Sequence, residues 1–141
     1  MLLLDVIEHL EDDVAALQAA RRLLTEGGVL VVTVPAYPWL WSGHDAALGH
    51  RRRYVAEGLR RLVEGAGYRV ERLTYFNTVL FPAIAATRLY KRWRGDDRHD
   101  LRRPGPTLNR LLEMLFALER HVVPSPALPF GTSLMVVARR P

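Results

Sequence analysis

A chain of 141 residues, 49% of them hydrophobic, is long enough for one domain with a real core and too apolar for a disordered protein. The absence of cysteine excludes disulfides and thiolate metal sites, and we expect a cytoplasmic protein without a signal peptide. The longest apolar run, 79–86, is far shorter than the ~20 residues that span a membrane. The net charge of +5 permits an anionic partner, although a solvated arginine-rich surface is the plainer interpretation.

The opening stretch predicts a strand, a helix and a second strand. An apolar run at 1–4 leads to the acidic segment 11–13, whose charges and capping oxygens suit the first turn of a helix. The inward face of this helix is predicted from apolar residues at helical spacing, namely Val14, Leu17, Ala20 and Leu24. Gly27-Gly28 supplies a left-handed helix exit, and the run 29–34 predicts a strand covered on both faces. A right-handed crossover then makes the two strands parallel neighbours.

The middle of the chain predicts a helix followed by a strand. The segment 55–66 is amphipathic, with apolar positions at Val55, Leu59, Leu62, Val63 and Ala66. Gly65-Ala66-Gly67 ends that helix and precedes a strand, so we interpret it as a C-cap and reject a phosphate-binding loop. The alternation of the strand 68–76 slips between Glu71 and Leu73, which predicts a bulge or bend.

A further helix is expected from Val79 to about Trp93, capped by Asn77 or Thr78 and with Pro82 in or near its first turn. It begins apolar and ends basic, which permits contact with a membrane surface. A helix packed beside the sheet with an exposed basic end is the plainer interpretation.

The last third predicts a connection, a helix and a strand. The segment 95–106 is charged and contains two prolines, as is typical of a solvated connection. Thr107 can cap a helix with a broad apolar face. The run 132–138 is apolar on both faces, which favours an interior strand.

Three motifs in the first half are specific in their order and spacing: Asp5-Val6-Ile7-Glu8-His9-Leu10-Glu11-Asp12, Leu24-Thr25-Glu26-Gly27-Gly28-Val29-Leu30 and Gly49-His50-Arg51-Arg52-Arg53-Tyr54. Together they resemble the class I S-adenosylmethionine-dependent methyltransferases, in the small-molecule subgroup often called type 11 or type 12. The resemblance assigns the first motif to the family's fourth strand, the second to the entry into its fifth strand, and the third to the lead into the next helix. It also implies that the family's Gly-rich loop and ribose-binding acid precede Met1.

The resemblance implies an α/β fold in a single domain over 1–141. The expected sheet is a partial Rossmann-like methyltransferase sheet, mostly parallel, whose last strand is antiparallel and lies between the strands beginning at Val29 and Tyr68. A helical insertion, 77–128, precedes that last strand. In the family such an insertion holds substrate-selecting elements.

The loop after residue 35 contains the candidate substrate and acid–base residues. Its aromatic residues are Tyr37, Trp39 and Trp41, and it emerges at the carboxyl end of a strand, where ligands of open α/β sheets bind. We interpret it as the wall or lid of a substrate pocket, and a cover over the end of the core is an equal alternative. His44, Asp45 and His50 could form an acid–base group, with His44 or His50 as general base. Their spacings match no tight ligand pattern, so no metal is expected.

Arg51-Arg52-Arg53 is the densest positive cluster in the sequence. With Tyr54 beside it, a phosphate or nucleic-acid contact is conceivable, but no sequence-specific nucleic-acid module is recognisable. A charged lead-in whose arginine stems cover apolar surface is the favoured interpretation.

The resemblance implies S-adenosylmethionine as cofactor and methyl transfer to a small-molecule or lipid-linked acceptor. By the same resemblance, the cofactor-binding residues are Leu4, Asp5, Val6 and His9. The candidates for the acceptor side are Tyr37, Trp39, Trp41 and His44. Because the 141 residues lack the Gly-rich loop, we expect impaired activity and millimolar or weaker cofactor binding. The alternative is a catalytically silent binding or assembly module that docks through 51–53 or the two later helices.

Overall fold

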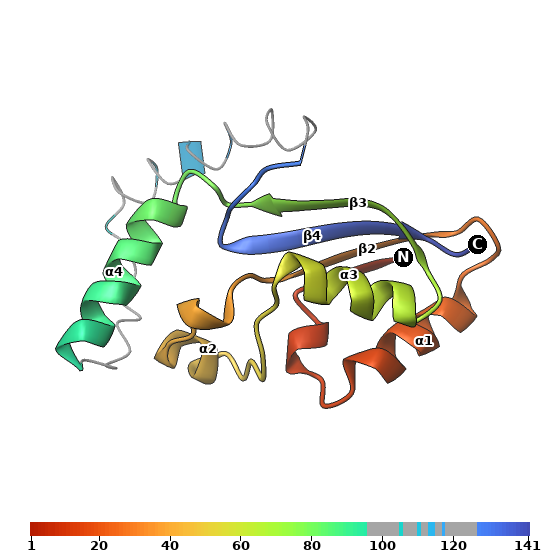
Figure 1. Ribbon diagram of the computed structural model, residues 1–141, viewed down its shortest axis with the longest axis horizontal. Helices are drawn as coiled ribbons and strands as arrows, with labels where there is room; N and C mark the ends of the chain where they lie inside the picture. The colour runs from red at the N-terminus through yellow and green to blue at the C-terminus, as the bar shows by residue number, and fades with distance from the viewer. Residues whose placement is uncertain (96–104, 106–109, 111–112, 115–116, 118–126) are drawn as a thin grey trace.

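The computed structural model describes residues 1–95, 105, 110, 113–114, 117 and 127–141. Within these ranges four strands form one sheet in the order β1-β2-β4-β3 (Figure 1). Their bounds are Leu2–Leu4 for β1, Val29–Pro35 for β2, Arg69–Phe76 for β3 and Ser133–Arg139 for β4. Among the described residues, α1 spans Asp13–Leu23, α2 Gly43–Ala47, α3 Ala56–Gly65 and α4 Phe81–Arg94.

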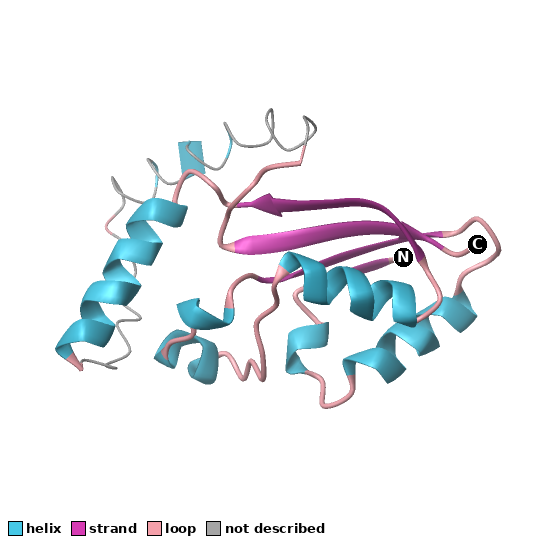
Figure 2. Cartoon of the chain, in the orientation of Figure 1, coloured by secondary structure: helices cyan, strands magenta, loops and turns pink. Residues whose placement is uncertain are grey.

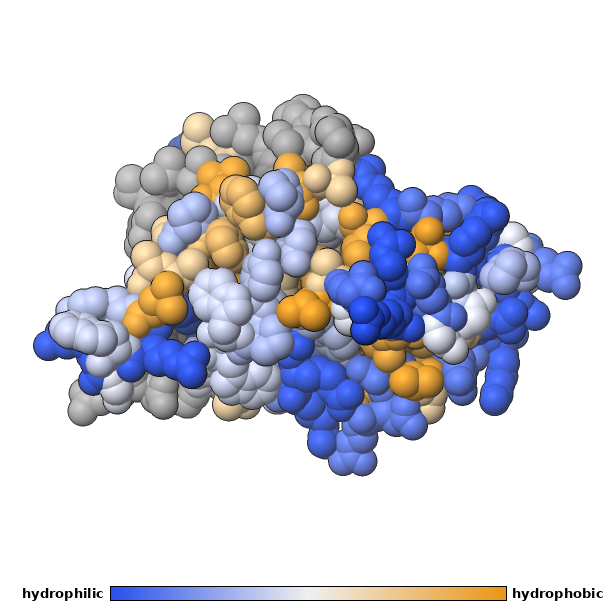
Figure 3. All heavy atoms as spheres, in the orientation of Figure 1, coloured by the Kyte–Doolittle hydropathy of each residue, from blue (hydrophilic) through white to orange (hydrophobic). Residues whose placement is uncertain are grey.

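The helices take two positions relative to the sheet. Figure 2 shows α1 and α3 along one face of it, whereas α2 and α4 lie beyond the end at which β2 and β3 finish. In the same orientation, hydrophilic residues predominate at the right-hand end of the molecule, and hydrophobic residues gather at the upper left (Figure 3). None of the described helices is long and apolar enough to span a membrane.

The pairing of the strands confirms that the first two strands are parallel neighbours. β1 pairs with β2 in parallel, with Leu3 opposite Val32. β4 lies between β2 and β3 and is antiparallel to both, as expected of the last strand. The expectation of a mostly parallel sheet is confirmed only in part. Because the reversed strand is interior, two of the three pairings are antiparallel.

The core lies between the sheet and the helices α1 and α3. Alternate residues of β2 and β4 are buried on this face, including Leu30, Val32 and Val136, which are 0% exposed. The opposite face is less covered, since Val29 and Val31 of β2 are half-buried. The prediction that β2 is covered on both faces is therefore wrong for the described residues at these two positions.

α1 starts as predicted but differs in its inward face and in its end. Asp12 caps the helix by accepting a hydrogen bond from the Ala15 backbone N–H at 2.8 Å, which confirms the acidic start. Val14 is 40% exposed, because the helix turns only one face to the sheet. At the other end the helix finishes at Leu23, and Leu24 is already extended.

Gly27 and Gly28 do not end α1, as the pattern had predicted. The Arg140 guanidinium donates hydrogen bonds to the carbonyls of Arg21 and Leu24 there, so a distant side chain satisfies the helix end. Gly27 instead has a φ of 73° in the turn before β2, where the Gly28 N–H donates to the Thr25 carbonyl.

The next two elements follow the sequence pattern closely. α3 buries Leu59 and Val63, and Gly67 adopts a φ of 89° two residues after the helix. The C-cap interpretation of that glycine pair is therefore confirmed. β3 has a register shift between Val70 and Arg72, one residue before the predicted slip.

The start of α4 corrects the predicted cap. The helix begins at Phe81 with Pro82 in its first turn, and no side chain caps it. Thr78 donates its hydroxyl hydrogen to the Phe130 carbonyl at 2.7 Å, and Asn77 donates its amide to Ser133 Oγ at 3.3 Å. Both side chains therefore tie the residues after β3 to the start of β4 and to the loop before it. Most of the connection 95–106, of the helix predicted from Thr107 and of the later part of the insertion 77–128 lies outside the described residues.

Candidate functional site

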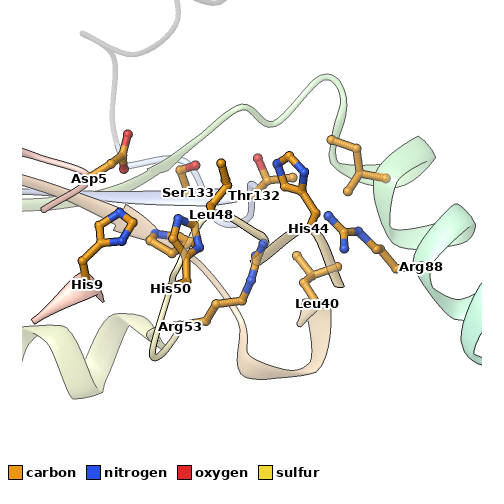
Figure 4. Close-up of a pocket in the computed structure, with 12 residues that line it drawn as sticks. Asp5, His9, Leu40, His44, Leu48, His50, Arg53, Arg88, Thr132 and Ser133 are labelled. Carbon is orange, nitrogen blue, oxygen red and sulfur yellow. The ribbon is translucent and has the colours of Figure 1, made fainter. Parts of the chain in front are cut away.

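A cavity of about 400 Å³ opens at the edge of the sheet where β1 and β2 end and β4 begins (Figure 4). This edge contains the carboxyl ends of the parallel pair, the usual position of ligands in open α/β sheets. The cavity is therefore where a ligand is expected. Its charged and imidazole lining consists of Asp5, His9, His44, His50, Arg53 and Arg88.

The β1 end of the cavity is fixed by contacts between Asp5 and Thr33. The Asp5 backbone N–H donates to the Thr33 carbonyl at 3.1 Å and to Thr33 Oγ1 at 3.0 Å. Asp5 Oδ1 in turn accepts a hydrogen bond from the Thr33 hydroxyl at 3.2 Å. Asp5 has a φ of 51°, a left-handed conformation in which aspartate is tolerated better than most residues. These contacts hold the turn after β1 against the neighbouring strand.

On the side of the cavity away from β1, the Asp45 carboxylate connects α2 to the loop before α3 through hydrogen bonds. It is 0% exposed and lies in the first turn of α2, where its Oδ2 accepts a hydrogen bond from the Ser42 backbone N–H at 2.9 Å. The Ser42 hydroxyl accepts one from the His44 N–H, which completes a capping box. Asp45 Oδ1 receives the Arg53 Nε–H at 2.7 Å and faces His50 Nδ1 at 3.0 Å.

This carboxylate is ionised in the folded chain. Burial alone would raise the pKa of Asp45, but hydrogen bonding and charge from Arg53, with the contacts from His50 and Ser42, lower it below its ordinary value. Because an ionised carboxylate only accepts hydrogen bonds, the His50 Nδ1 carries the proton that points at Asp45. The Nε2 of neutral His50 is therefore the nitrogen that can accept a proton.

His44 lines the same cavity with different electrostatics. Burial lowers the pKa of His44, and the Arg88 guanidinium lowers it further. The neutral imidazole therefore predominates near pH 7. The structure thus brings the two predicted general-base candidates, His44 and His50, to one cavity. Only His50 contacts a buried carboxylate through its side chain.

Replacing Arg88 with glutamine should raise the pKa of His44, because it removes the second cause of the shift and leaves burial in place. The pKa should move toward its ordinary value of 6.5 without reaching it. An imidazole titration by NMR measures this. Arg61→Gln is the control, since Arg61 is an exposed residue of α3 paired with Glu57. An unchanged His44 pKa in Arg88→Gln would contradict the assignment.

The predicted aromatic wall forms a cluster outside the lining of this cavity. The Tyr37 ring stacks on Tyr75 with centroids 5.2 Å apart and lies 5.5 Å from Phe81 and 5.7 Å from Trp39. Burial, and a hydrogen bond that the Tyr37 hydroxyl donates to Tyr75, raise the pKa of Tyr37. Trp41 is 43% exposed. The arrangement favours the alternative of a cover over the end of the core, and an acceptor role for these aromatic residues stays a prediction.

The predicted cofactor residues divide into two groups. Asp5 and His9 line the cavity, whereas Leu4 and Val6 are exposed and do not. Asp5 and His9 lie in the turn after β1, where Asp5 has a left-handed backbone and His9 belongs to a 3₁₀ turn. Their contact with a cofactor stays a prediction.

The three arginines of 51–53 are held by contacts within the chain. Arg51 donates its Nε–H to the His9 carbonyl and pairs with Glu11 at 3.1 Å. Arg52 pairs with Asp13 at 3.1 Å, and Arg53 donates to the Ala36 carbonyl as well as to Asp45. These contacts support the interpretation of a structural lead-in over that of a phosphate or nucleic-acid site.

Sequence reasoning did not single out Arg88 or Glu8. Arg88 reaches the cavity from α4 and lies 4.0 Å from Asp45 Oδ2. Arg88 follows Ile84 by four residues, so both side chains lie on the same face of α4, and both line the cavity. This spacing could have indicated Arg88 in the sequence. Glu8 is fully buried beside this site, although nothing in its local pattern predicts burial of a charge.

A family profile described as a methyltransferase domain matches residues 1–73, just over half of the chain. The chain belongs to the class I S-adenosylmethionine-dependent methyltransferases. This confirms the resemblance based on the three motifs. The four-stranded sheet accordingly corresponds to part of the Rossmann-like methyltransferase fold. No curated protein sequence matches the chain.

Solved structures of methyltransferases share this part of the fold. A chain from the Haloferax volcanii complex of the Trm112 methyltransferase activator with a methyltransferase has 16% identity and a TM-score of 0.53. Haemonchus contortus phosphoethanolamine N-methyltransferase 2, solved with S-adenosyl-L-methionine, has 13% identity and a TM-score of 0.53. A Bacillus halodurans protein described as a methyltransferase has 16% and 0.54.

These likenesses cover 99% of this methyltransferase chain but only 53%, 32% and 63% of the three solved chains, respectively. The chain therefore spans less than two thirds of the length of these relatives. At such identities the comparison shows the shared fold alone.

Proposed function

We propose that this methyltransferase chain provides the acceptor side of S-adenosylmethionine-dependent methyl transfer to a small-molecule or lipid-linked acceptor. The observation that carries the proposal is the cavity at the carboxyl ends of β1 and β2, which combines apolar walls with converging polar groups. Membership of the family supplies the reaction class, and the cavity supplies a place for the acceptor.

In this proposal the chain positions the acceptor and receives its proton. Methyl transfer requires the acceptor nucleophile in line with the donor methyl group, so much of the rate comes from holding it there. His50 Nε2 accepts the proton of an acceptor hydroxyl or amine, and the buried Asp45 carboxylate stabilises the resulting imidazolium. Arg88 and His44, on the far side of the cavity, favour an acceptor with an anionic group.

The residues present suit only one end of the cofactor. By resemblance to the family, we assign Asp5 and His9, with Leu4 and Val6 beside them, to the methionine portion of S-adenosylmethionine. The sequence holds no Gly-rich loop between a strand and a helix, because Gly65 and Gly67 follow a helix. We therefore assign the grip on adenosine to a segment outside these 141 residues.

The isolated chain should accordingly bind S-adenosylmethionine with a dissociation constant in the millimolar range or weaker. Titration calorimetry measures this, and a longer polypeptide translated from the in-frame upstream sequence serves as comparison. Restored micromolar affinity in the longer polypeptide would support the assignment. Micromolar binding by the isolated chain would contradict it.

The alternative of a silent docking module loses part of its basis in the structure. The cluster 51–53 is engaged with acids and carbonyls of the same chain, so it offers little free charge to a partner. Contact of α4 with a membrane surface stays a prediction. It is supported by the 81% exposure of Trp93 and by the basic residues of the last helical turn.

A further inference from the structure

Glu8 presents a buried carboxylate that the proposed methyl transfer does not use. The residue is 0% exposed, and within the described part of the chain neither carboxylate oxygen accepts a hydrogen bond. Burial raises the pKa of Glu8, and the nearby backbone N–H of the same residue offsets only part of this effect. A buried carboxylate in this condition is costly unless a cation or a donor compensates it.

Two histidines stand next to this carboxylate. Glu8 and His9 belong to a short 3₁₀ turn, Ile7–His9, directly after β1, and His50 reaches the same place from the loop before α3. The rings of His9 and His50 lie 4.8 Å apart, edge to face. Figure 4 shows the two imidazoles side by side at the cavity.

The hydrogen bonds of both rings select one tautomer. His9 Nδ1 lies 3.2 Å from the Gly49 carbonyl, and His50 Nδ1 lies 3.0 Å from the Asp45 carboxylate. Both partners are acceptors, so each Nδ1 carries a hydrogen and each Nε2 keeps its lone pair. Histidines that bind metals are commonly held in this way, through a hydrogen bond from the second nitrogen to a carboxylate or carbonyl.

The three groups lie close enough to share one ion. One ligand atom each from Glu8, His9 and His50 lies within 4.8 Å of the other two. Ligands bound at about 2.0–2.2 Å stand roughly 3–3.5 Å apart in such sites, so side-chain movements of about 1 Å would close the set. Two imidazoles and one carboxylate are the donors of catalytic zinc sites and of facial iron sites.

We propose that Glu8, His9 and His50 bind a divalent transition-metal ion, with Zn²⁺ as its representative. His9 and His50 line the cavity, so the remaining coordination positions face the space where a ligand would lie. The site shares His50 with the proposed methyl transfer, and a bound ion would occupy the Nε2 lone pair that accepts the proton there. Metal binding is nevertheless measured without S-adenosylmethionine or an acceptor, so its failure is distinguishable from failure of the methyl transfer. His50 lies 41 positions after His9 in the sequence, which is why the spacing of His44, Asp45 and His50 gave no sign of the site.

The test is a metal titration of the chelator-treated full chain. Competition with a chromophoric chelator measures Zn²⁺ affinity and stoichiometry, and the visible absorption of bound Co²⁺ reports histidine coordination. We expect one ion per chain with a dissociation constant in the micromolar range or tighter. A folded chain that binds no stoichiometric ion would overturn the proposal.

Variants then assign the ligands. Glu8→Gln keeps the shape of the side chain and should weaken Zn²⁺ binding at least about 100-fold, because it removes a direct ligand. Glu11→Gln is the matched control, since this exposed glutamate lies three residues away and the same charge is removed. It should leave the affinity unchanged.

His9→Ala provides a second variant at a half-exposed position, should Glu8→Gln fail to fold as judged by circular dichroism. It should weaken Zn²⁺ binding to a similar degree and abolish the Co²⁺ band. Wild-type affinity in a folded Glu8→Gln or His9→Ala chain would show that the ion binds elsewhere and would refute this site.

Discussion

Replacing Asp45 with alanine should lower the free energy of unfolding by about 3–5 kcal/mol, the usual cost of removing one partner from a buried ion pair. The Asp45 side chain is 0% exposed and that of Arg53 is 9% exposed, so the variant would leave a guanidinium without its counter-charge away from water. His50 and the Ser42 N–H would lose their acceptor as well. Urea denaturation at pH 7 measures the effect.

An exposed ion pair provides the control, because it shows how much stability is lost when an ion pair is removed without burial. Glu57 and Arg61 form an ion pair at 2.9 Å on the exposed side of α3, with side chains 62% and 76% exposed, respectively. Glu57→Ala should cost less than about 1 kcal/mol, because water screens an exposed pair. Equal losses in the two variants would show that Asp45 is not the organising group of the site.

The contribution of Asp45 to the free energy of unfolding should depend on pH. The pKa of Asp45 is lowered in the folded chain, so its contribution is complete above the ordinary carboxyl pKa of about 3.8 and is lost as the pH falls through the lower folded value. The difference between wild type and Asp45→Ala should therefore shrink below about pH 3.8. A difference that stays constant down to pH 2 would contradict an ionised Asp45.

Elements whose signal is local were predictable from the sequence. The apolar run at 29–34 and the interior strand at 132–138 form β2 and β4, because a strand inside a sheet needs apolar residues along most of its length. The strand slip near Glu71 and the glycines after α3 were also predictable, because each depends on the backbone conformation of a few neighbouring residues. The order of the strands came from the family resemblance.

Helix ends were less predictable, because distant residues complete them. Arg140, at the far end of the chain, satisfies the carbonyls that finish α1, so the glycines at 27–28 were free to form the next turn. Thr78 contacts the Phe130 carbonyl and leaves α4 without a side-chain cap. Neither partner can be chosen from local sequence.

The candidate site was predictable only where its residues are close in sequence. His44, Asp45 and His50 were recognised as a group because His50 lies only six positions after His44. The capping box of α2 then buries Asp45. Arg88 and Glu8 reach the site through tertiary packing. The aromatic residue Tyr37 was expected at the acceptor, but its stacking on Tyr75 of β3 directs it into a separate cluster.

Gly131→Ala should be among the most destabilising single-methyl substitutions in the described part of the chain. A Cβ at this position would lie 2.1 Å from the Phe76 carbonyl oxygen and 2.8 Å from its carbon. Both are backbone atoms at the end of β3, so no side-chain rotation can relieve the clash, and the strand ends must move apart. We expect a loss of about 3 kcal/mol in the free energy of unfolding, at the upper end of overpacking effects.

The control for this variant is Gly65→Ala, which adds the same methyl group at the last residue of α3. A Cβ there meets no atom within 4 Å, and alanine favours a helix, so the chain should gain up to about 1 kcal/mol. Wild-type stability of Gly131→Ala would mean that β3 and β4 are further apart than the structure places them. Because Thr132 and Ser133 line the cavity directly after Gly131, the same displacement should also alter the cavity wall.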